Sequence, residues 1–329
     1  MTADESDDGG ETEGEGRVTR RRLLTAGGVV GAGAVAGSLS AVYVVSPDVP
    51  VDVLEETYAN EASEFAEIGG ARLHYRDQGP RDAPAVVLMH GFSASLHTWE
   101  GWVERLGDDY RIVTLDLPAF GLTGPNESGE YGADYYADVV EELVESLGID
   151  SFVVGGSSMG GEVAWRYALD YPERVEKLAL VGAAGYETDG EMTLIRLARM
   201  PVVNRVPRHV TPRFAVRDMV ESAYADDSLV TDETVDRYYD LIRREGNREA
   251  IVRRLRAPAD SRADEIPDVD VPTLVMWGEQ DTWIPVEHAH RFDDDIPDTR
   301  LVTYDGVGHV PMEETPDLSA PDMAEFLEA

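Results

Sequence analysis

A serine lies at the centre of a glycine-rich stretch, GGSSMGG, near the middle of the chain. A serine hydroxyl is a weak nucleophile near neutral pH, so it needs a base that removes its proton. The frame Gly-x-Ser-x-Gly permits a sharp turn between a strand and a helix, and it fits when centred on Ser158, between Gly156 and Gly160. Centred on Ser157, the frame would require glycine in place of Met159, so Ser157 is interpreted as a polar neighbour. Because glycine-rich turns also follow strands in proteins without such chemistry, the motif needs partners elsewhere in the chain.

Those partners follow in the order serine, acid, histidine. Asp281 ends an apolar stretch in WGEQDTWIP, and His309 lies in a glycine-flanked loop, GVGHVP, after the last apolar stretch. The histidine would act as the base, and the aspartate would orient it. Glu279 and an acid after an earlier strand compete with Asp281 for this role, but Asp281 lies where the strand should end. The constellation predicts acyl transfer through a covalent intermediate on Ser158.

A fourth piece is the loop HGF, which follows an earlier apolar run. The backbone N–H of Phe92 in this loop, together with that of Met159, would form an oxyanion hole for the developing negative charge. Gly91 belongs to the same loop, and His90 is interpreted as a residue that holds the loop in place rather than as a second base. This chemistry needs no metal and no cofactor.

The elements that must hold these residues alternate between strand and helix. The apolar runs that end in the serine turn, the acid loop and the histidine loop are typical of strands buried on both faces. Amphipathic segments such as YYADVVEELVESLGI predict the helices between them. The fold class is therefore α/β, with a mostly parallel central sheet and helices on both faces. An antiparallel hairpin, EFAEIGGARLHYRDQG, is expected at its start.

A helical block interrupts this alternation. Residues 186–268 contain helical patterns, several prolines and no clear strand, and we expect them to form a lid over the carboxyl ends of the strands. The α/β core then comprises residues 64–185 and 269–329, and a linker at 46–63 precedes it. The block holds 14 arginines against 17 acidic residues, so it is nearly neutral beside an acidic core. Its arginines would dock the lid onto the core, face an anionic substrate or the membrane surface, or pair within the lid; they include Arg196, Arg199, Arg205, Arg208 and Arg213.

These motifs resemble the α/β-hydrolase superfamily, and the resemblance extends from about residue 64 to the C-terminus. The segment DLPAFG at 116–121 also resembles a strand-end loop of that family. The resemblance implies the α/β-hydrolase fold, a triad of Ser158, Asp281 and His309, and a small-molecule, ester-like substrate. Within the superfamily, GSSMGG and the helical lid resemble the serine esterases and the carbon–carbon bond hydrolases. Epoxide hydrolases and haloalkane dehalogenases do not match, because they use an aspartate nucleophile.

Hydrolysis of a carboxylic ester is the expected activity. The alternatives within the family are hydrolysis of a carbon–carbon bond in a vinylogous diketone and cofactor-free perhydrolysis. In family members that cleave carbon–carbon bonds, tryptophan follows the catalytic histidine, but here Val310 follows His309. An alternative of another class is a non-catalytic binding protein with the same fold. Such proteins usually lose a triad residue, and all three are present here.

Charge limits the partners and the environment. The chain has 28 basic and 65 acidic residues, a net charge of −37, and Lys177 is its sole lysine. A surface this acidic repels itself at ordinary ionic strength and is screened by concentrated salt. The pattern resembles proteins of extreme halophiles, haloarchaea among them. It excludes nucleic acid as a partner, since phosphate binding needs a basic face, and the absence of cysteine excludes disulfides and thiolate metal sites.

The N-terminal segment predicts export. Residues 1–22 form an acidic tail and a basic segment, whose arginines in TRRRLL (19–24) resemble a twin-arginine signal. Residues 23–45 are uncharged and rich in glycine and alanine, as in a cleaved signal or a retained membrane anchor. The expected location is therefore extracellular or at the outer face of the cytoplasmic membrane. The sequence does not indicate an oligomeric state.

Two further motifs are weaker. His288 and His290 lie two residues apart, which places them on different sides of a helix, so they are interpreted as a solvated face and not as a metal pair. Asn126 begins the glycosylation sequon NES in an expected loop, but such short sequons also arise by chance. Whether Asn126 carries a glycan is left open by the sequence.

Overall fold

The computed structural model describes residues 46–187, 210–257 and 261–329. Within these ranges no helix is long and apolar enough to cross a membrane, and no group of three or more His, Cys, Asp or Glu side chains suits a metal ion. The expected export segment at 1–45 lies outside the described residues and stays a prediction. The same holds for four of the lid arginines: Arg196, Arg199, Arg205 and Arg208.

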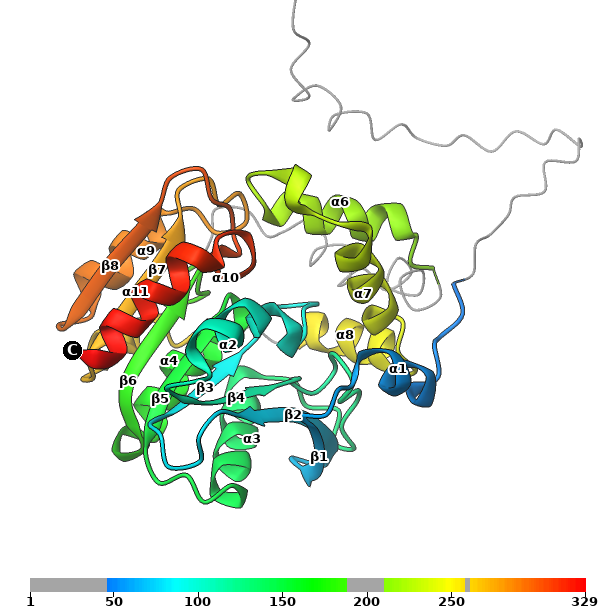
Figure 1. Ribbon diagram of the computed structural model, residues 1–329, viewed down its shortest axis with the longest axis horizontal. Coiled ribbons are helices and arrows are strands. Elements are labelled where there is room, and N and C mark those ends of the chain that lie inside the picture. The colour runs from blue at the N-terminus through cyan, green and yellow to red at the C-terminus, as the bar shows by residue number, and fades with distance from the viewer. Residues whose placement is uncertain (1–45, 188–209, 258–260) are drawn as a thin grey trace, which may run out of the picture. The chain divides into compact units, whose positions relative to one another are not determined.

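In the described part of the chain, eight strands form one sheet. They are β1 (Ser63–Ile68), β2 (Ala71–Gln78), β3 (Ala85–Met89), β4 (Arg111–Leu115), β5 (Phe152–Ser157), β6 (Val175–Val181), β7 (Thr273–Gly278) and β8 (Thr299–Tyr304). Their order in the sheet is β1-β2-β4-β3-β5-β6-β7-β8 (Figure 1). The β1–β2 hairpin is antiparallel and β2 pairs antiparallel with β4, whereas every pair from β4 to β8 is parallel. The predicted fold class is confirmed.

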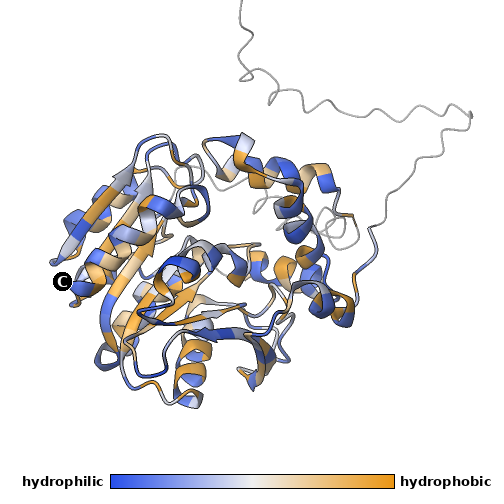
Figure 2. Cartoon of the chain, in the orientation of Figure 1, coloured by the Kyte–Doolittle hydropathy of each residue, from blue (hydrophilic) through white to orange (hydrophobic). Residues whose placement is uncertain are grey.

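The middle strands are buried on both faces because their sequences are almost continuously apolar. Every residue of β3, β4 and β5 is buried, whereas the edge strands β1 and β8 are only partly covered. Figure 2 shows hydrophobic residues along the middle strands and polar residues on the outer helix surfaces. Burial of these strands fixes the position of the loops that follow them.

Helices cover both faces of the sheet (Figure 1). On one face, α3 (Ala133–Ser146), α4 (Met159–Asp170) and α9 (Glu287–Asp295) contribute to one hydrophobic cluster with the strands. On the other face, α2 (Glu100–Leu106) and α11 (Pro316–Glu328) contribute to a second cluster. The sheet therefore has a core on each side, and the loops at its carboxyl edge are left to form a site.

The segment before β1 differs from the expected linker. Helix α1 (Val51–Tyr58) forms within residues 46–63, and its Leu54 is only 1% exposed. Leu54 packs with Leu122 and Leu241, and the Tyr58 hydroxyl donates to Asp240 Oδ2 at 3.0 Å. The helix has only eight residues and Leu54 is the one that is buried, so its packing depends on partners far away in the sequence. Local patterning could not reveal them.

Residues 210–257 and 261–268 form a helical block with α6 (Arg213–Ala223), α7 (Asp232–Ile242), α8 (Asn247–Arg256) and the 3₁₀ turn η6 (Ala263–Asp268). Helices α6 and α7 pack on each other through a small cluster of valines. The C-terminal end of α6 contacts the loop after β8, where the His309 N–H donates to the Ala223 carbonyl oxygen at 2.6 Å. The block thus reaches the loops at the carboxyl edge of the sheet, where the lid was expected.

Candidate active site

Ser158 lies between β5 and α4 in a backbone conformation that few residues other than glycine adopt, with φ 53° and ψ −117°. The turn is tight. A Cβ at position 156 would lie 2.2 Å from the Gly160 carbonyl oxygen, and a Cβ at position 160 would lie 2.3 Å from the Met89 carbonyl oxygen. Backbone atoms cannot retreat as a flexible side chain can, so both positions require glycine. Ser157 is the buried last residue of β5, whereas Ser158 is partly exposed.

Asp281 and His309 come together from the loops after β7 and β8. His309 Nδ1 lies 2.7 Å from Asp281 Oδ2, and the other oxygen, Oδ1, accepts the N–H groups of Trp283 and Ile284 at 2.8 and 2.9 Å. These bonds hold the carboxylate as an acceptor, so Nδ1 carries the ring proton. His309 is 2% exposed, and its Nε2 is buried without a hydrogen-bond partner among the described residues. Nε2 is therefore the ring nitrogen of His309 whose lone pair can accept a proton.

One pocket joins the predicted residues. Ser158 and His309 line it together with Gly91 and Phe92 from the loop after β3. Helices α6 and α7 and the loops after β7 and β8 complete its wall, mainly with apolar and aromatic side chains. None of the lining residues in the described ranges is Asp, Glu, Lys or Arg. Such a pocket offers a substrate mainly apolar surface and no charged partner among the described residues.

The loop after β3 lies against the nucleophile. A Cβ at Gly91 would be 3.2 Å from Ser158 Cβ, so the backbone of this loop contacts the serine closely. Met159 is the first residue of α4, and its N–H therefore has no intrahelical acceptor. Phe92 lines the pocket and Met159 directly follows Ser158, so both residues predicted to form the oxyanion hole lie at the site.

His90 is fully buried and bonded at both ring nitrogens. Nδ1 donates to the Gly91 carbonyl oxygen at 2.7 Å, and Nε2 accepts the Leu117 N–H at 3.0 Å. Burial lowers the pKa of His90, which favours this neutral form. His90 therefore connects the loop after β3 to the loop after β4, and the contacts agree with the predicted structural role.

Sequence reasoning missed two carboxylates that follow the histidine. Glu314 accepts the N–H of Gly308 at 2.7 Å and, from the turn after α6, the N–H groups of Ala225 and Asp226 at 3.0 and 2.9 Å. Glu313 accepts hydrogen bonds from the hydroxyl groups of three pocket residues. The available signal was the pair of acidic residues one helical turn beyond His309, in HVPMEETP. Nothing in that segment indicated which donors they would meet.

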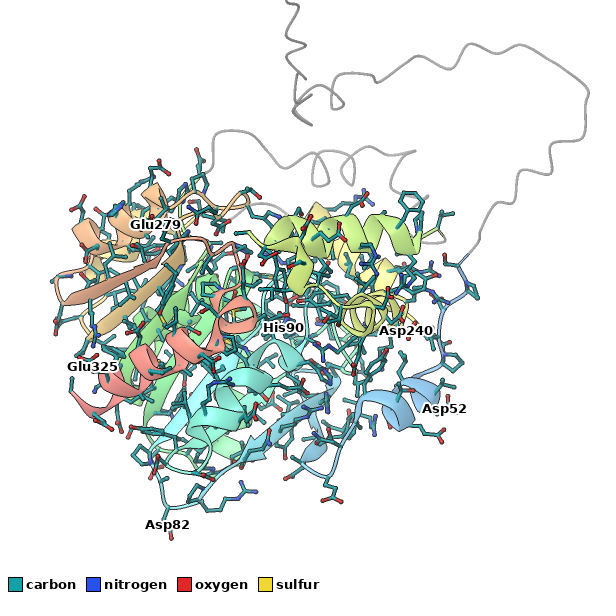
Figure 3. The ribbon with its side chains drawn as sticks, turned by 45° about the horizontal axis from the view of Figure 1, so that its top comes forward. Asp52, Asp82, His90, Asp240, Glu279 and Glu325 are labelled. Atoms are coloured by element: carbon teal, nitrogen blue, oxygen red, sulfur yellow. The ribbon has the colours of Figure 1, made fainter. Side chains whose placement is uncertain are left out.

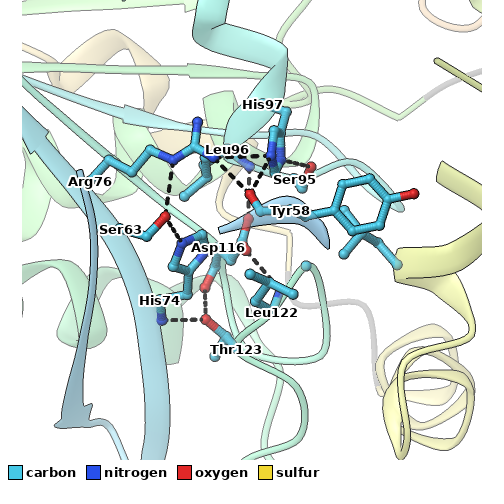
Figure 4. A network of polar contacts seen from close by, with 12 residues as sticks. Tyr58, Ser63, His74, Arg76, Ser95, Leu96, His97, Asp116, Leu122 and Thr123 are labelled. Atoms are coloured by element: carbon cyan, nitrogen blue, oxygen red, sulfur yellow. Dashed lines mark hydrogen bonds and ion pairs between the residues drawn. The ribbon is translucent and has the colours of Figure 1, made fainter. Parts of the chain in front are cut away.

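A buried network near β1 and β2 has the same order of side chains as a catalytic triad (Figure 4). His74 Nδ1 lies 2.7 Å from Asp116 Oδ2, and His74 Nε2 lies 2.9 Å from Ser63 Oγ. Ser63 Oγ also accepts the N–H of Asn60 at 3.1 Å and Arg76 Nε at 3.3 Å. Its lone pairs are therefore committed to the network, which ties the hairpin to the loop after β4.

Asp116 is the centre of this network. Besides His74 it accepts the N–H of Leu96 at 2.7 Å and that of Leu122 at 2.8 Å. Burial alone would raise the pKa of Asp116, but the charge and the hydrogen bond of His74 outweigh it and hold that pKa well below its usual range. The bond to Leu96 fixes the start of the 3₁₀ turn η2 (Leu96–Trp99), which carries the pocket residue Thr98. Through Asp116, the expected strand-end loop thus fixes the position of the turn that carries the pocket residue Thr98.

In each of the two weaker motifs one side chain is buried. His288 is 8% exposed and packs edge-on against Tyr186, so the expected solvated face is wrong for this residue, although His290 is exposed. The Asn126 side chain is also 8% exposed; its Nδ2 donates to the Glu130 carbonyl oxygen and its Oδ1 accepts the Gly129 N–H, both at 2.7 Å. Asn126 forms hydrogen bonds within its turn, and whether it carries a glycan stays a question for the sequence motif alone.

The arginines of residues 210–268 divide between two of the expected roles. Arg213 pairs with two aspartates of α7, inside the helical block. Arg237 pairs with Glu100 of α2 at 3.3 Å, and Arg262 pairs with Asp170 of α4 at 2.8 Å. Docking onto the acidic core is therefore correct for Arg237 and Arg262, whereas Arg213 stabilises the block itself.

The fold and the pocket define an α/β hydrolase, and comparison with known proteins agrees. Residues 84–316 match the alpha/beta hydrolase fold family, and the chain belongs to this family.

Three similar proteins show the range of the relatives. An uncharacterized hydrolase, YugF of Bacillus subtilis, is 28% identical over 79% of this chain and 96% of its own length. The 2-hydroxy-6-oxo-6-phenylhexa-2,4-dienoate hydrolase of Comamonas testosteroni is 27% identical over 78% of this chain and 93% of its own length. The solved structure of a thermophilic esterase from Thermogutta terrifontis has a TM-score of 0.70 and 26% identity, covering 80% of this chain and 98% of that one.

Proposed function

We propose that this protein hydrolyses a carboxylic ester through an acyl-enzyme intermediate on Ser158. The observation that supports the proposal is a single pocket that contains a serine on a strained turn and a histidine ready to accept its proton. His309 Nδ1 is bonded to Asp281, and His309 Nε2 is buried without a partner in the described residues. Nucleophile, base and orienting acid are the three groups that acyl transfer requires.

The proposed reaction has two halves. His309 Nε2 takes the proton from Ser158 Oγ while that oxygen attacks the ester carbonyl carbon. The N–H groups of Phe92 and Met159 stabilise the oxyanion of the tetrahedral intermediate. When the intermediate collapses, His309 gives the proton to the leaving alcohol. Water then attacks the acyl carbon with His309 as the base again, which releases the acid and restores the serine.

Cleavage of a carbon–carbon bond is the second candidate, because the Comamonas relative is named for a dienoate substrate. That substrate carries a carboxylate, and no Lys or Arg lines the pocket in the described residues. Val310 also stands where the carbon–carbon hydrolases carry tryptophan. The esterase from Thermogutta terrifontis supports the first candidate at similar identity. We therefore place ester hydrolysis first.

Turnover of a p-nitrophenyl ester in concentrated salt tests the proposal. Wild-type protein should release nitrophenol, and Ser158→Ala should lower kcat by about 10⁴-fold or more, because the proposed acyl-enzyme forms on this hydroxyl. Ser157→Ala is the matched control: it removes the neighbouring hydroxyl and should retain most of the activity. Activity that survives Ser158→Ala, or is lost equally in Ser157→Ala, would contradict the assignment of the nucleophile.

A further inference from the structure

We propose that Glu313 makes the pocket selective for uncharged acyl groups by holding a negative charge directly behind the pocket wall. The inference rests on the proposed ester hydrolysis and adds a substrate class to it. Glu313 lies on α10 (Pro311–Glu314), the short helix that begins two residues after His309. It lines an adjoining cavity that shares Thr98 and Tyr224 with the pocket of Ser158, so it stands on the far side of that wall.

Three hydroxyl groups of the pocket wall point to Glu313. Thr98 Oγ1 and Tyr238 OH donate to Oε1 at 2.5 and 2.9 Å, and Tyr224 OH donates to Oε2 at 2.8 Å. Thr98 comes from η2, Tyr224 follows the end of α6, and Tyr238 lies on α7, so the carboxylate joins the helical block to the core beside the site. An ionised carboxylate can only accept, and here it accepts from all three.

This arrangement removes the hydrogen-bond donors of the wall from the pocket. Burial, together with the adjacent charge of Glu313, raises the pKa of Tyr224 and of Tyr238, so both phenols keep their protons. Each of those protons is directed to Glu313. A substrate in the pocket therefore meets aromatic and apolar surface, and its charged or polar ends find no donor on this side.

The charge of Glu313 is also left without a cation. No Lys or Arg in the described ranges forms an ion pair with it. Arg237 lines the same cavity, but its ion pair is with Glu100, and the cavity also holds Glu314, so the acidic side chains there outnumber the one arginine. Salt screens a partly buried charge much less than an exposed one. An acyl chain that ends in a carboxylate would approach this negative charge through low-dielectric surroundings, where like charges repel most strongly. A neutral chain of the same shape pays no such penalty.

The test compares three p-nitrophenyl esters with acyl groups of nearly the same shape. They are the 5-methylhexanoate, which is apolar, the glutaramate, which is polar and neutral, and the mono-glutarate, which is anionic. Wild-type kcat/KM, corrected for spontaneous hydrolysis, should be at least about tenfold lower for the glutarate than for the glutaramate. In Glu313→Gln this ratio should approach one, because the side chain keeps its shape and loses its charge. An unchanged ratio in Glu313→Gln would overturn the inference.

Two controls separate the charge of Glu313 from other causes. Glu104→Gln changes the net charge equally at an exposed position on α2, where the side chain is 81% exposed, and should leave the ratio unchanged. Tyr238→Phe disturbs the same network but keeps the carboxylate, so it should preserve the discrimination against the glutarate. If Tyr238→Phe abolished the discrimination as Glu313→Gln does, packing rather than charge would be responsible and the inference would be wrong.

A salt series on the wild-type protein needs no variant. The ratio should persist from low to molar KCl, because a charge behind the wall is poorly screened, whereas a ratio that reaches one would assign the effect to surface charge and overturn the inference. The outcome also separates the two proposals. Ser158-dependent hydrolysis of the neutral esters without discrimination defeats this inference alone, whereas no hydrolysis of any ester defeats the proposed function and this inference with it.

Discussion

Asp281 is held by more than the histidine that it orients. One oxygen of its carboxylate faces His309, and the other accepts two backbone N–H groups from the turn that follows it. The carboxylate therefore cannot rotate without leaving those donors unsatisfied, which costs free energy in a buried site. This fixed orientation keeps the proton on His309 Nδ1 and leaves Nε2 to act as the base.

Replacing Asp281 with asparagine should therefore lower kcat by about 10⁴-fold, because the amide can donate to Nδ1 and favour the wrong tautomer of His309. The measurement is steady-state hydrolysis of a neutral p-nitrophenyl ester. Glu279→Gln is the control, since Glu279 is exposed at the surface (Figure 3) and accepts the Thr303 hydroxyl at 2.9 Å. A loss in Glu279→Gln comparable to that in Asp281→Asn would show that the acid had been assigned to the wrong carboxylate.

At the residue scale, the sequence could identify side chains whose positions follow from local rules. A serine in the glycine frame must lie on the sharp turn, and residues that end parallel strands must meet at one edge of the sheet. Glu313 could not be found this way, because its three donors lie 75 to 215 residues away. The His74–Asp116 contact, 42 residues apart, had no local signature either. Side chains that join distant segments became visible only in the structure.

At the scale of elements, the strands and helices of the core were predictable because each carries its own periodicity. Continuous apolar runs gave β3 to β7, and amphipathic spacing gave α3. Helix α1 was missed although Val51, Leu54 and Tyr58 have helical spacing, because eight residues are too short a window for that spacing to decide between a helix and a linker. Its burial comes from Leu122, in the loop after β4, and from Leu241 of α7.

Leu54→Ala should therefore destabilise the protein by about 2–5 kcal/mol, the usual range for removing a buried leucine side chain. The measurement is the free energy of unfolding from denaturant titration at fixed salt concentration. Val53→Ala is the matched control on the same helix, because Val53 is 49% exposed and should change this free energy little. Equal effects of the two substitutions would mean that α1 does not pack as described and that residues 46–63 act as a linker after all.

At the scale of the whole molecule, two electrostatic effects oppose each other. Ion pairs such as Arg262 with Asp170 and Arg237 with Glu100 favour the folded state at low salt. Repulsion among 65 acidic residues, opposed by only 28 basic ones, disfavours it. Even if every basic residue formed a pair, more than half of the acidic side chains would be left over. Asp52 and Asp82 are examples at the surface (Figure 3).

Because repulsion has the larger number of contributors, salt should stabilise this protein. Raising KCl from about 0.1 M to about 1 M shortens the Debye length from about 10 Å to about 3 Å, which removes repulsion between surface carboxylates but leaves close pairs partly intact. The melting temperature should therefore rise with KCl, by about 2–4 °C for each 1 kcal/mol gained.

A variant with Asp52→Asn, Glu56→Gln and Asp82→Asn should melt higher at low salt and gain less from KCl, since three exposed charges are gone while the core is unchanged. Sucrose at matched water activity is the control for general exclusion of solutes from the surface. A melting temperature that falls with KCl would show that the ion pairs, and not the excess of acidic residues, dominate the electrostatics of the fold.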